Sequence, residues 1–463
     1  MSSRRNTVLA ATLAAVMAVG PLAAPVAALE PLSIGTSSLK DATLRVYGFV
    51  ETDSIYDTTQ SYTEEQDSAA PLTRNTISKT GGAPGATNVA GTRSRDMMSV
   101  RNSRLGLELN VPAQDNGIKG KAVFEMDFLG NAAVNTAPGA APGSQTERDY
   151  FNNPSVRVRH AFVEVSKDEV GAKLGQYWSL LGWQPYYFPG EAVVLPGVGQ
   201  LYRRFAQARV TDTHVFGDWT LESAADAAKP AEMNSGSPEW HAGLRVASTK
   251  YKGASIAGAG TQMVGLSAGV SAALIPVRTQ SAGNPTGGAI AVDLLVPIIP
   301  SSDGKSRDNT LVWAAEGVTG RGVGGLEMAG LTFGVPGVTA AGSNAGTAID
   351  SGIAGVNTSG SNIELIQMRA FRTHLQYSLA KWSASVGYAQ VEGRNLDRFA
   401  AANTAAAFGI SPKLQYGYVS AFYDAATWLR FAGEVNQTKA TFNDPNNRYA
   451  RNNRYQLSAY FMF

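Results

Sequence analysis

The feature that most constrains this chain is a strict two-residue alternation of apolar and polar side chains that continues through long segments. In residues 428–436 the odd positions are apolar, whereas the even positions include Arg430 and Glu434. In residues 121–128 the even positions are apolar, and the odd ones carry two carboxylates. Successive side chains of a β-strand point to opposite faces of the sheet. One face of each segment therefore suits hydrocarbon, and the other suits water.

Segment length distinguishes two all-β architectures. A soluble sandwich also alternates, but its strands typically have ~5–6 residues, whereas a tilted membrane-spanning strand needs ~9–11. The alternating segments here run to about 10–13 residues. Charged residues make up 16% of the chain, below the ~25% of ordinary soluble domains. We predict an all-β, antiparallel transmembrane β-barrel; a secreted soluble β protein is the alternative, which membrane fractionation would test.

The first 28 residues have the parts of a secretory signal peptide. Arg4 and Arg5 form a positive end, residues 8–19 are apolar, and residues 26–28 are small, as at a cleavage site. A retained membrane anchor is the alternative interpretation. We predict a signal peptide over 1–28, a short periplasmic segment over 29–42, and an outer-membrane barrel over 43–463. The absence of cysteine from the sequence excludes disulfides and thiolate sites.

Counting the alternating segments gives about sixteen strands, an even number in the range where a barrel lumen is wide enough to hold water. In the middle of the chain, strands are expected over 238–249 and 252–264. Long polar connections alternate with tight ones, as in barrels that have short turns at one end and long loops at the other. The long connections are 58–98, 131–154 and 335–361, and the tight ones include 168–169 and 380–381.

Several stretches, taken in chain order, resemble bacterial general porins. They are Thr43–Asp53, Arg101–Gly106 with Gly120–Phe128, Arg157–Glu164 with Leu174–Ser179, and the last strand, which ends on Phe463. Their order and the stretch 178–211 are most similar to the DcaP-like trimeric porins, which pass small anions such as dicarboxylates. The resemblance implies a homotrimer and a C-terminal strand that the barrel-assembly machinery recognises. One departure is that 29–42 is too short for the coiled segment that such porins often carry before the barrel.

Residues 180–200 follow a predicted strand and are too apolar for a solvated surface loop. In porins the loop at this place folds into the barrel and narrows it. We therefore expect an infolded constriction loop; the alternative is a latch over a neighbouring subunit. The residues assigned to the constriction are Trp183, Tyr186, Tyr187, Phe188 and Glu191.

Charged side chains on the inward rows are the candidates for selectivity. Arg157 and Arg159 lie two residues apart and share a face, although Val163 and Val165 fall on the same row and leave its direction open. A guanidinium group stays charged and matches a carboxylate, which favours an anion site. The alternative is that these arginines pair structurally with acidic residues. The candidates are Arg104, Arg157, Arg159, Arg203, Arg209, Arg430, Glu51, Glu125, Asp127 and Glu434, with Arg372 as a further inward arginine.

Catalysis and cofactor binding find little support. The four histidines, at 160, 214, 241 and 374, have no metal-ligand spacing, and residues 443–447 are more typical of a turn than of a calcium site. With 39 basic and 37 acidic residues, the chain is not a globally basic nucleic-acid binder.

We predict an outer-membrane porin without catalytic activity, metal or cofactor, through which small hydrophilic solutes, favouring anions, diffuse passively. Its expected partners are outer-membrane lipid and lipopolysaccharide, further copies of itself, the barrel-assembly machinery and small anionic solutes. The alternative function is a plugged barrel with an adhesion or surface-structural role, which planar-bilayer conductance would distinguish.

Overall fold

A computed structural model of the chain describes residues 32–33, 41–62, 93–130, 155–182, 198–230, 236–257, 260–277, 285–324, 331, 333–335, 352–358, 363–400, 410–442 and 449–463. Over 254–257 and 260–262 it describes the backbone alone. The predicted signal peptide lies outside these residues. No helix in the described part of the chain is long and apolar enough to cross a membrane.

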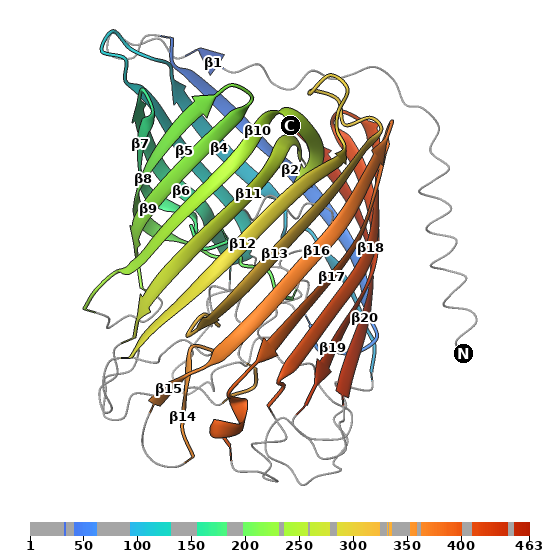
Figure 1. Cartoon of the computed structure of the whole chain (residues 1–463). Coiled ribbons are helices and arrows are strands. Elements are labelled where there is room, and N and C mark those ends of the chain that lie inside the picture. The colour runs from blue at the N-terminus through green and yellow to red at the C-terminus, as the bar shows by residue number, and fades with distance from the viewer. Residues whose placement is uncertain are drawn as a thin grey trace, which may run out of the picture.

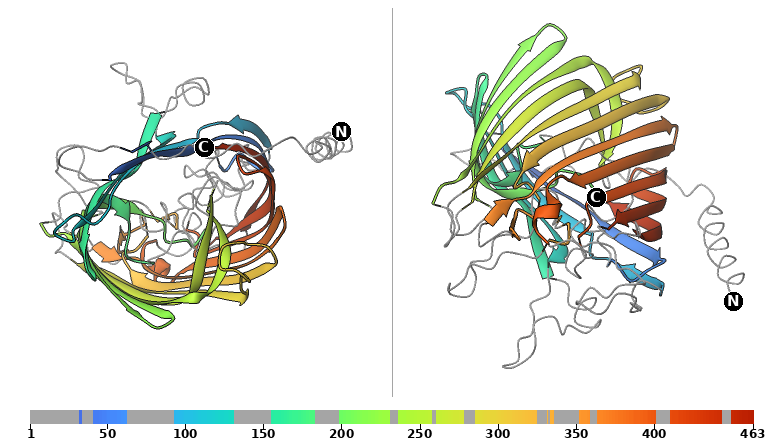
Figure 2. Two further views of the ribbon diagram at one scale, coloured as in Figure 1. Left: turned by 90° about the horizontal axis from the view of Figure 1, so that it is seen from above. Right: turned by 60° about the horizontal axis from the view of Figure 1, so that its bottom comes forward.

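Sixteen strands of the described chain form a closed antiparallel ring, in which each strand pairs with its neighbours along the chain and the last pairs with the first (Figures 1 and 2). This confirms the predicted architecture. The ring consists of β2 (Thr43–Asp57), β4 (Arg104–Val111), β5 (Lys119–Gly130), β6 (Ser155–Lys167), β7 (Val170–Trp178), β8 (Arg204–Phe216), β9 (Trp219–Ala228), β10 (Glu239–Ala257), β11 (Gly260–Pro276), β12 (Thr286–Ile299), β13 (Thr310–Arg321), β16 (Gln367–Leu379), β17 (Trp382–Gly393), β18 (Lys413–Ala426), β19 (Leu429–Thr441) and β20 (Tyr449–Met462).

The ring closes where the C-terminal residue meets the first long strand. Gly48 and Phe463 exchange two backbone hydrogen bonds, at 3.0 and 3.1 Å. A side chain at position 48 would not fit, because its Cβ would lie 2.1 Å from the carbonyl oxygen of Arg104. The short strands β1 (Leu32–Ser33) and β3 (Arg95–Ser99) also pair with β2. The ring therefore has no open edge between its first and last strands.

The two ends of the barrel differ, as the sequence predicts. The end that carries the C-terminus has short connections, seen at the top of Figure 1. Two of them turn at Asp168 and Ala380, with φ of 50° and 49°. The connections at the other end are longer, and we call this end the loop end.

The middle of the chain departs from the expected strands. Two strands lie there as expected, but their predicted bounds are wrong: β10 continues through residue 250 to Ala257, and β11 begins at Gly260. Where the sequence predicts the end of a strand, after residue 249, the structure has a shift of register between Ala247 and Lys252. Beyond it the hairpin bends toward the inner wall: the backbone N–H of Ser301 donates to the Lys252 carbonyl at 2.8 Å. In Figure 2, left, the end of this hairpin lies over the opening of the ring.

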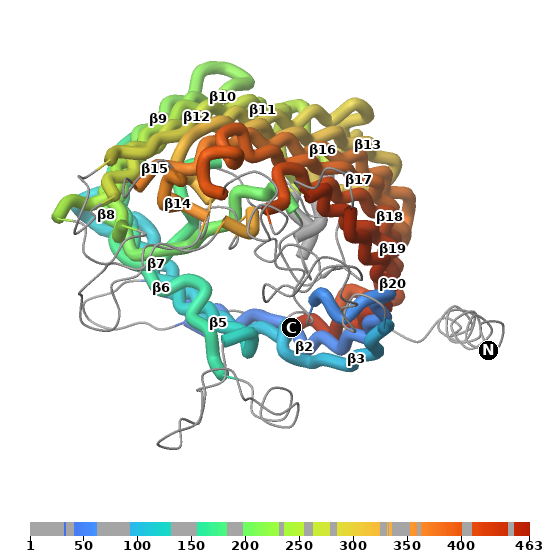
Figure 3. Tube along the Cα trace, turned by 90° about the horizontal axis from the view of Figure 1, so that it is seen from below, coloured from blue at the N-terminus to red at the C-terminus, as the bar shows by residue number. Residues whose placement is uncertain are grey.

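Two further described strands form a separate two-stranded sheet. β14 (Ala354–Val356) and β15 (Ile363–Leu365) pair with each other in the long connection between β13 and β16. Viewed from the loop end in Figure 3, both lie within the outline of the ring. A short 3-10 helix, η4 (Leu396–Arg398), follows β17, and its Leu396 belongs to the same apolar cluster as Ala354 and Leu365. β14, β15 and η4 therefore occupy part of the barrel opening at the loop end.

Candidate functional site: the inner wall of the barrel

The inner wall of the barrel is polar and covered, whereas the outer wall is apolar and exposed. On β16, Phe371 is 47% exposed while its neighbour Arg372 is 2% exposed. The same contrast separates Val435 from Glu434 on β19. This is the reverse of a soluble protein, whose apolar side chains face inward. The alternation therefore turns the hydrocarbon face outward, as a membrane barrel requires.

The described ends of the segment 180–200 lie inside the barrel, against strands far from the one that they follow. The backbone N–H of Gly182 donates to Ser271 on β11 at 2.9 Å, and the N–H of Leu201 donates to Glu316 on β13 at 3.1 Å. The carbonyl of Val198 accepts from Arg372 on β16 at 3.3 Å. Both described ends of the segment thus lie inside the ring, as expected of an infolded constriction loop; in Figure 3 the green end runs inside the ring.

The residues assigned to the tip of that loop lie outside the described residues. They are Trp183, Tyr186, Tyr187, Phe188 and Glu191. The described ends are closely packed, since Leu180 and Leu181 are 0% and 2% exposed. Leu181, Val198 and Leu201 belong to an apolar cluster with inward residues of β12 to β18. Both ends of the loop are therefore held by packing as well as by hydrogen bonds.

A β-bulge in β6 explains how arginines and valines at alternate positions of this strand can face opposite sides of the wall. Glu125 on β5 pairs with His160, but the next residue, Met126, pairs with Val158, so that Arg159 is the extra residue. A bulge reverses the phase of the alternation. Arg157 and Arg159 therefore face inward before the bulge, although Val163 faces outward after it and is 54% exposed.

A cluster of cations surrounds two carboxylates on this part of the inner wall. Arg157 and Arg159 both bind Asp127, with contacts of 2.8 and 2.9 Å, and Arg159 also binds Glu125 at 2.7 Å. Arg104 lies 3.6 Å from Glu125. The predicted pairing of arginines with Glu125 and Asp127 is thus present.

One member of this cluster was not predicted. Arg204 begins β8, and its guanidinium lies over the ring of Tyr202, 5.3 Å from the ring centre. The hydroxyl of Tyr202 accepts from Arg159 at 3.3 Å. Four guanidinium groups thus gather around two carboxylates. We call these six residues the arginine cluster: Arg104, Arg157, Arg159, Arg204, Glu125 and Asp127. Its formal charge is +2, because four positive groups stand against two negative ones.

Arg203 and Arg209 belong to a different arrangement, a line of alternating charges across β8, β9 and β10. Arg203 binds Glu239 at 2.9 Å, and Arg209 binds Asp226 at 3.0 Å. His241 joins the two pairs: its Nδ1 lies 2.7 Å from Asp226, and its Nε2 lies 3.6 Å from Glu239. All five side chains are buried. We call this line the charge ladder; it stabilises the wall more than it presents charge to a solute.

The remaining predicted residues face inward but do not join these groups. Arg430 binds Asp424 near the turn end, at 2.5 Å. Glu51 accepts from Asn102 at 2.6 Å, and Glu434 accepts from Tyr416 and Asn436 at 3.3 and 2.8 Å. Both glutamates are thus held by hydrogen bonds on the inner wall, and their expected pairing with arginines stays a prediction.

The histidines and acids do not assemble a metal site in the described part of the chain. The four histidines lie on β6, β8, β10 and β16, and among the described residues no group of three His, Asp or Glu side chains could hold a metal ion. The turn at 443–447 lies outside the described residues.

The comparisons with known proteins bear on the fold. No family model matches the sequence, and no curated protein has a detectably similar sequence. The solved structure of the outer membrane channel DcaP of Acinetobacter baumannii matches with a TM-score of 0.58 and 17% identity, over 93% of this chain and 99% of that one. An anion-selective porin from Comamonas acidovorans matches with a TM-score of 0.50 and 11% identity, over 91% of this chain and 100% of that one.

At these identities the likeness is one of fold. The chain has the fold of bacterial outer-membrane porins, with DcaP among the structures that share it. A large closed barrel with an apolar outer wall needs lipid around it, and the structures that share its fold are outer-membrane channels and porins, which is consistent with the outer membrane of a bacterium. Such a fold supports a channel for passive diffusion.

Proposed function

We propose that this protein is a porin through which small hydrophilic solutes diffuse passively, with a preference for small anions such as dicarboxylates. The observation that carries the preference is the arginine cluster, in which four guanidinium groups surround two carboxylates on the inner wall. Arg159 and Arg204 of the cluster lie over the ring of Trp178, the last residue of β7, which the loop follows. A charged ring at a constriction sets the ion preference of a pore.

Exposure within the cluster differs from one arginine to the next. The side chains of Arg157 and Arg104 are 28% and 19% exposed, whereas that of Arg159 is 2% exposed. A solute in the lumen can therefore reach the first two. Guanidinium groups offer a planar pair of donors to a carboxylate, which supports dicarboxylates as preferred solutes.

Planar-bilayer recording tests the proposal. We expect steady open steps of conductance and, in a salt gradient, a reversal potential of the sign given by anion preference. A small dicarboxylate as the only anion should still carry current. A reversal potential that indicates cation preference would contradict the anion assignment, and block by the dicarboxylate without current would contradict the solute class.

A second function, a plugged barrel with an adhesion or surface-structural role, is favoured by the burial of inward charges. Glu51, Asp57 and Arg454 are completely covered, although they lie on the inner wall. The apolar cluster at the loop end also fills part of the lumen. A plugged barrel would show no steady conductance in the same recordings, so one experiment separates the two functions.

Three expected partners and the lack of enzyme activity are part of the same proposal. We infer a homotrimer and recognition of the last strand by the barrel-assembly machinery from the resemblance to porins, and contact with lipopolysaccharide from the outer-membrane location. Crosslinking of the purified protein in detergent would test the trimer.

A further inference from the structure

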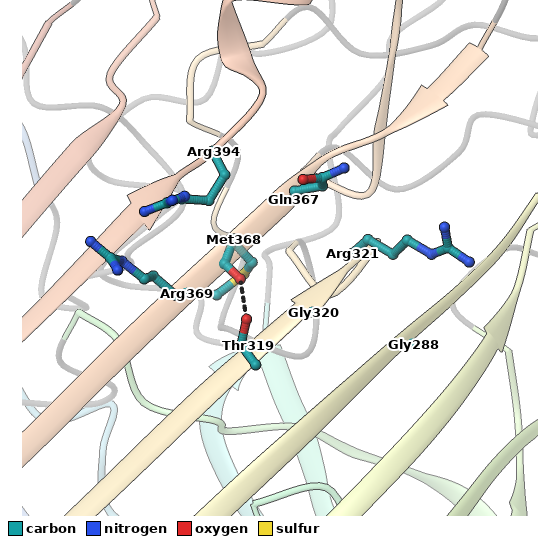
Figure 4. Close-up of a pocket in the computed structure, with 8 residues that line it drawn as sticks. All are labelled: Gly288, Thr319, Gly320, Arg321, Gln367, Met368, Arg369 and Arg394. Atoms are coloured by element: carbon teal, nitrogen blue, oxygen red, sulfur yellow. Dashed lines mark hydrogen bonds between the residues drawn. The ribbon is translucent and has the colours of Figure 1, made fainter.

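A cavity of about 520 Å³ lies on the outer wall at the loop end of the barrel. It lies over the ends of β12, β13 and β16, and three arginines line it (Figure 4). Arg369 and Arg394 lie side by side, and Arg321 extends to the other side, over Gly288. The position is outside the lumen, because Arg321 and Arg369 are exposed members of outward rows.

Strand register brings these residues together. Arg321 pairs with Gly288 on one side and with Gln367 on the other. One step further in, Thr319 pairs with Arg369, which in turn pairs with Glu392. Because Gly288 has no side chain, the wall is hollow beside Arg321. The cavity is therefore built mainly by regular pairing of strands, and Arg394 joins it from the position after the end of β17.

The cavity is positively charged. Glu392 is the carboxylate that the described chain places among these cations, and it lies 2.5 Å from Arg369, 4.0 Å from Arg394 and 3.9 Å from Lys413. Arg321 also lines the cavity, so four cations stand near one acid. The side chains of Arg369 and Arg394 are 57% and 53% exposed. We call these residues the rim cluster: Arg321, Arg369, Arg394, Lys413 and Glu392.

An apolar wall continues directly from the rim cluster toward the middle of the barrel. On β16 the outward residues after Arg369 are Phe371, Thr373 and Leu375, of which Phe371 is 47% exposed and Leu375 40% exposed. On β12 the outward residues after Gly288 are Ile290 and Val292, 54% and 55% exposed. A ligand that fits this surface has an anionic head and hydrocarbon beneath it.

We propose that the loop end faces the outer leaflet, as the longer loops of such barrels do, and that the rim cluster binds there the phosphate groups of a glycolipid, whose acyl chains lie along Ile290, Val292 and Phe371. Guanidinium groups bind phosphate through paired, charge-assisted hydrogen bonds, and basic pockets beside an apolar wall are typical lipid head-group sites. Free inorganic phosphate would use the cations but would gain nothing from the apolar wall. The site lies outside the pore, so it is independent of the solute that the pore passes.

The test is a binding titration of the purified protein in detergent with bisphosphorylated lipid A, followed by native mass spectrometry. The probes for comparison are the same lipid without phosphate groups and inorganic phosphate as a competitor. The test variant is Arg369→Gln with Arg394→Gln. The matched control is Lys119→Gln with Lys167→Gln, which removes two exposed cations at the turn end instead.

We expect the test variant to bind bisphosphorylated lipid A about tenfold more weakly, because two charge-assisted contacts are lost. The control should bind like the unmodified protein. Equal binding of the phosphate-free lipid, an unchanged affinity in the test variant, or an equal loss in the control would overturn the proposal. Complete displacement of the lipid by millimolar inorganic phosphate would show an ion site only.

Measuring the conductance of the test variant checks that the variant is folded. Both arginines lie on the outer wall, so the single-channel conductance should not change while lipid binding falls. If the test variant lost both conductance and lipid binding, the titration would be repeated with Arg321→Gln. If that variant kept its conductance and its lipid affinity, the proposal would fail. A failure of the pore proposal, seen as the absence of conductance in the unmodified protein, leaves the lipid titration readable.

Discussion

The Nε of Arg159 lies 2.7 Å from Oε1 of Glu125 in a nearly sealed part of the inner wall. Arg157, which also binds Asp127, remains 28% exposed. Two arginines separated by one residue thus have different surroundings. Arg159 holds the two carboxylates in place, whereas Arg157 presents part of its charge to the lumen.

Arg157→Gln should lower anion preference in reversal-potential measurements, because it removes an exposed charge while Arg159 still neutralises Asp127. Arg159→Gln should instead destabilise the protein by about 3–5 kcal/mol, since it leaves buried carboxylates uncompensated. Urea unfolding in detergent measures the second effect. An unchanged preference in the Arg157 variant would remove it from the selectivity wall.

The β-bulge makes a prediction about chain length. Deleting His160 should convert β6 into a regular strand that still turns Arg157 and Arg159 inward, because the bulge contains one residue more than its partner strand. The shortened protein should form a barrel whose migration in gels still changes on heating. Deleting Val163, which lies in a regular part of the same strand, should prevent folding, because a shift by one residue turns each following side chain to the other face. If both deletions behave alike, the bulge has no role in register.

The sequence predicts the ring well because each strand carries its own signal. Arg430 and Glu434 face inward and Val435 faces outward by alternation alone, and a membrane barrel cannot relax that rule. The position of the bulge, at Arg159, cannot be read from the sequence, because it depends on which residue of β5 lies opposite. The valines at 163 and 165 were the available signal: they point to a change of phase between them and the arginines.

Two other features escaped prediction for physical reasons. The hairpin of β10 and β11 consists largely of Gly, Ala and Ser after Lys252, so it has little polar contrast to mark its turn. The charge ladder joins Arg203, Glu239 and His241 across consecutive strands, and which of these residues meet follows from register. Single-strand patterns show which face a residue occupies, but they do not show its neighbour.

The charge ladder predicts a large difference between two aspartates that each bind a histidine. Asp226 lies 2.7 Å from His241 with both side chains covered, and Asp212 lies 2.9 Å from His214 with side chains 41% and 56% exposed. Asp226→Ala should cost about 3–5 kcal/mol of unfolding free energy, because it strands buried Arg209 and His241. Asp212→Ala should cost about 0–1 kcal/mol. Urea titration in detergent compares them, and equal costs would refute the role of the ladder.

The anchors of the infolded loop predict a change in pore size. Ser271→Ala with Glu316→Ala removes the acceptors of the Gly182 and Leu201 backbone N–H groups, at about 0.5–1.5 kcal/mol for each hydrogen bond. The loop should then sample positions nearer the wall strand from which it leaves, so single-channel conductance should rise and become noisier. Ser385→Ala, a buried serine on the inner face of β17, is the matched control. Unchanged conductance in the double variant would mean that apolar packing alone holds the loop.

Closure of the barrel gives the last prediction, which separates the role of the Phe463 backbone from that of its aromatic side chain. Deleting Phe463 removes two backbone hydrogen bonds to Gly48 and should lower stability by about 1–3 kcal/mol in urea unfolding. Phe463→Ala keeps both bonds, so it should fold in detergent micelles nearly as well as the unmodified protein. In cells it should accumulate less in the outer membrane, because we expect the assembly machinery to recognise the terminal aromatic side chain. If Phe463→Ala folds poorly in detergent as well, the aromatic side chain acts through packing, and the cellular defect would carry no information about recognition.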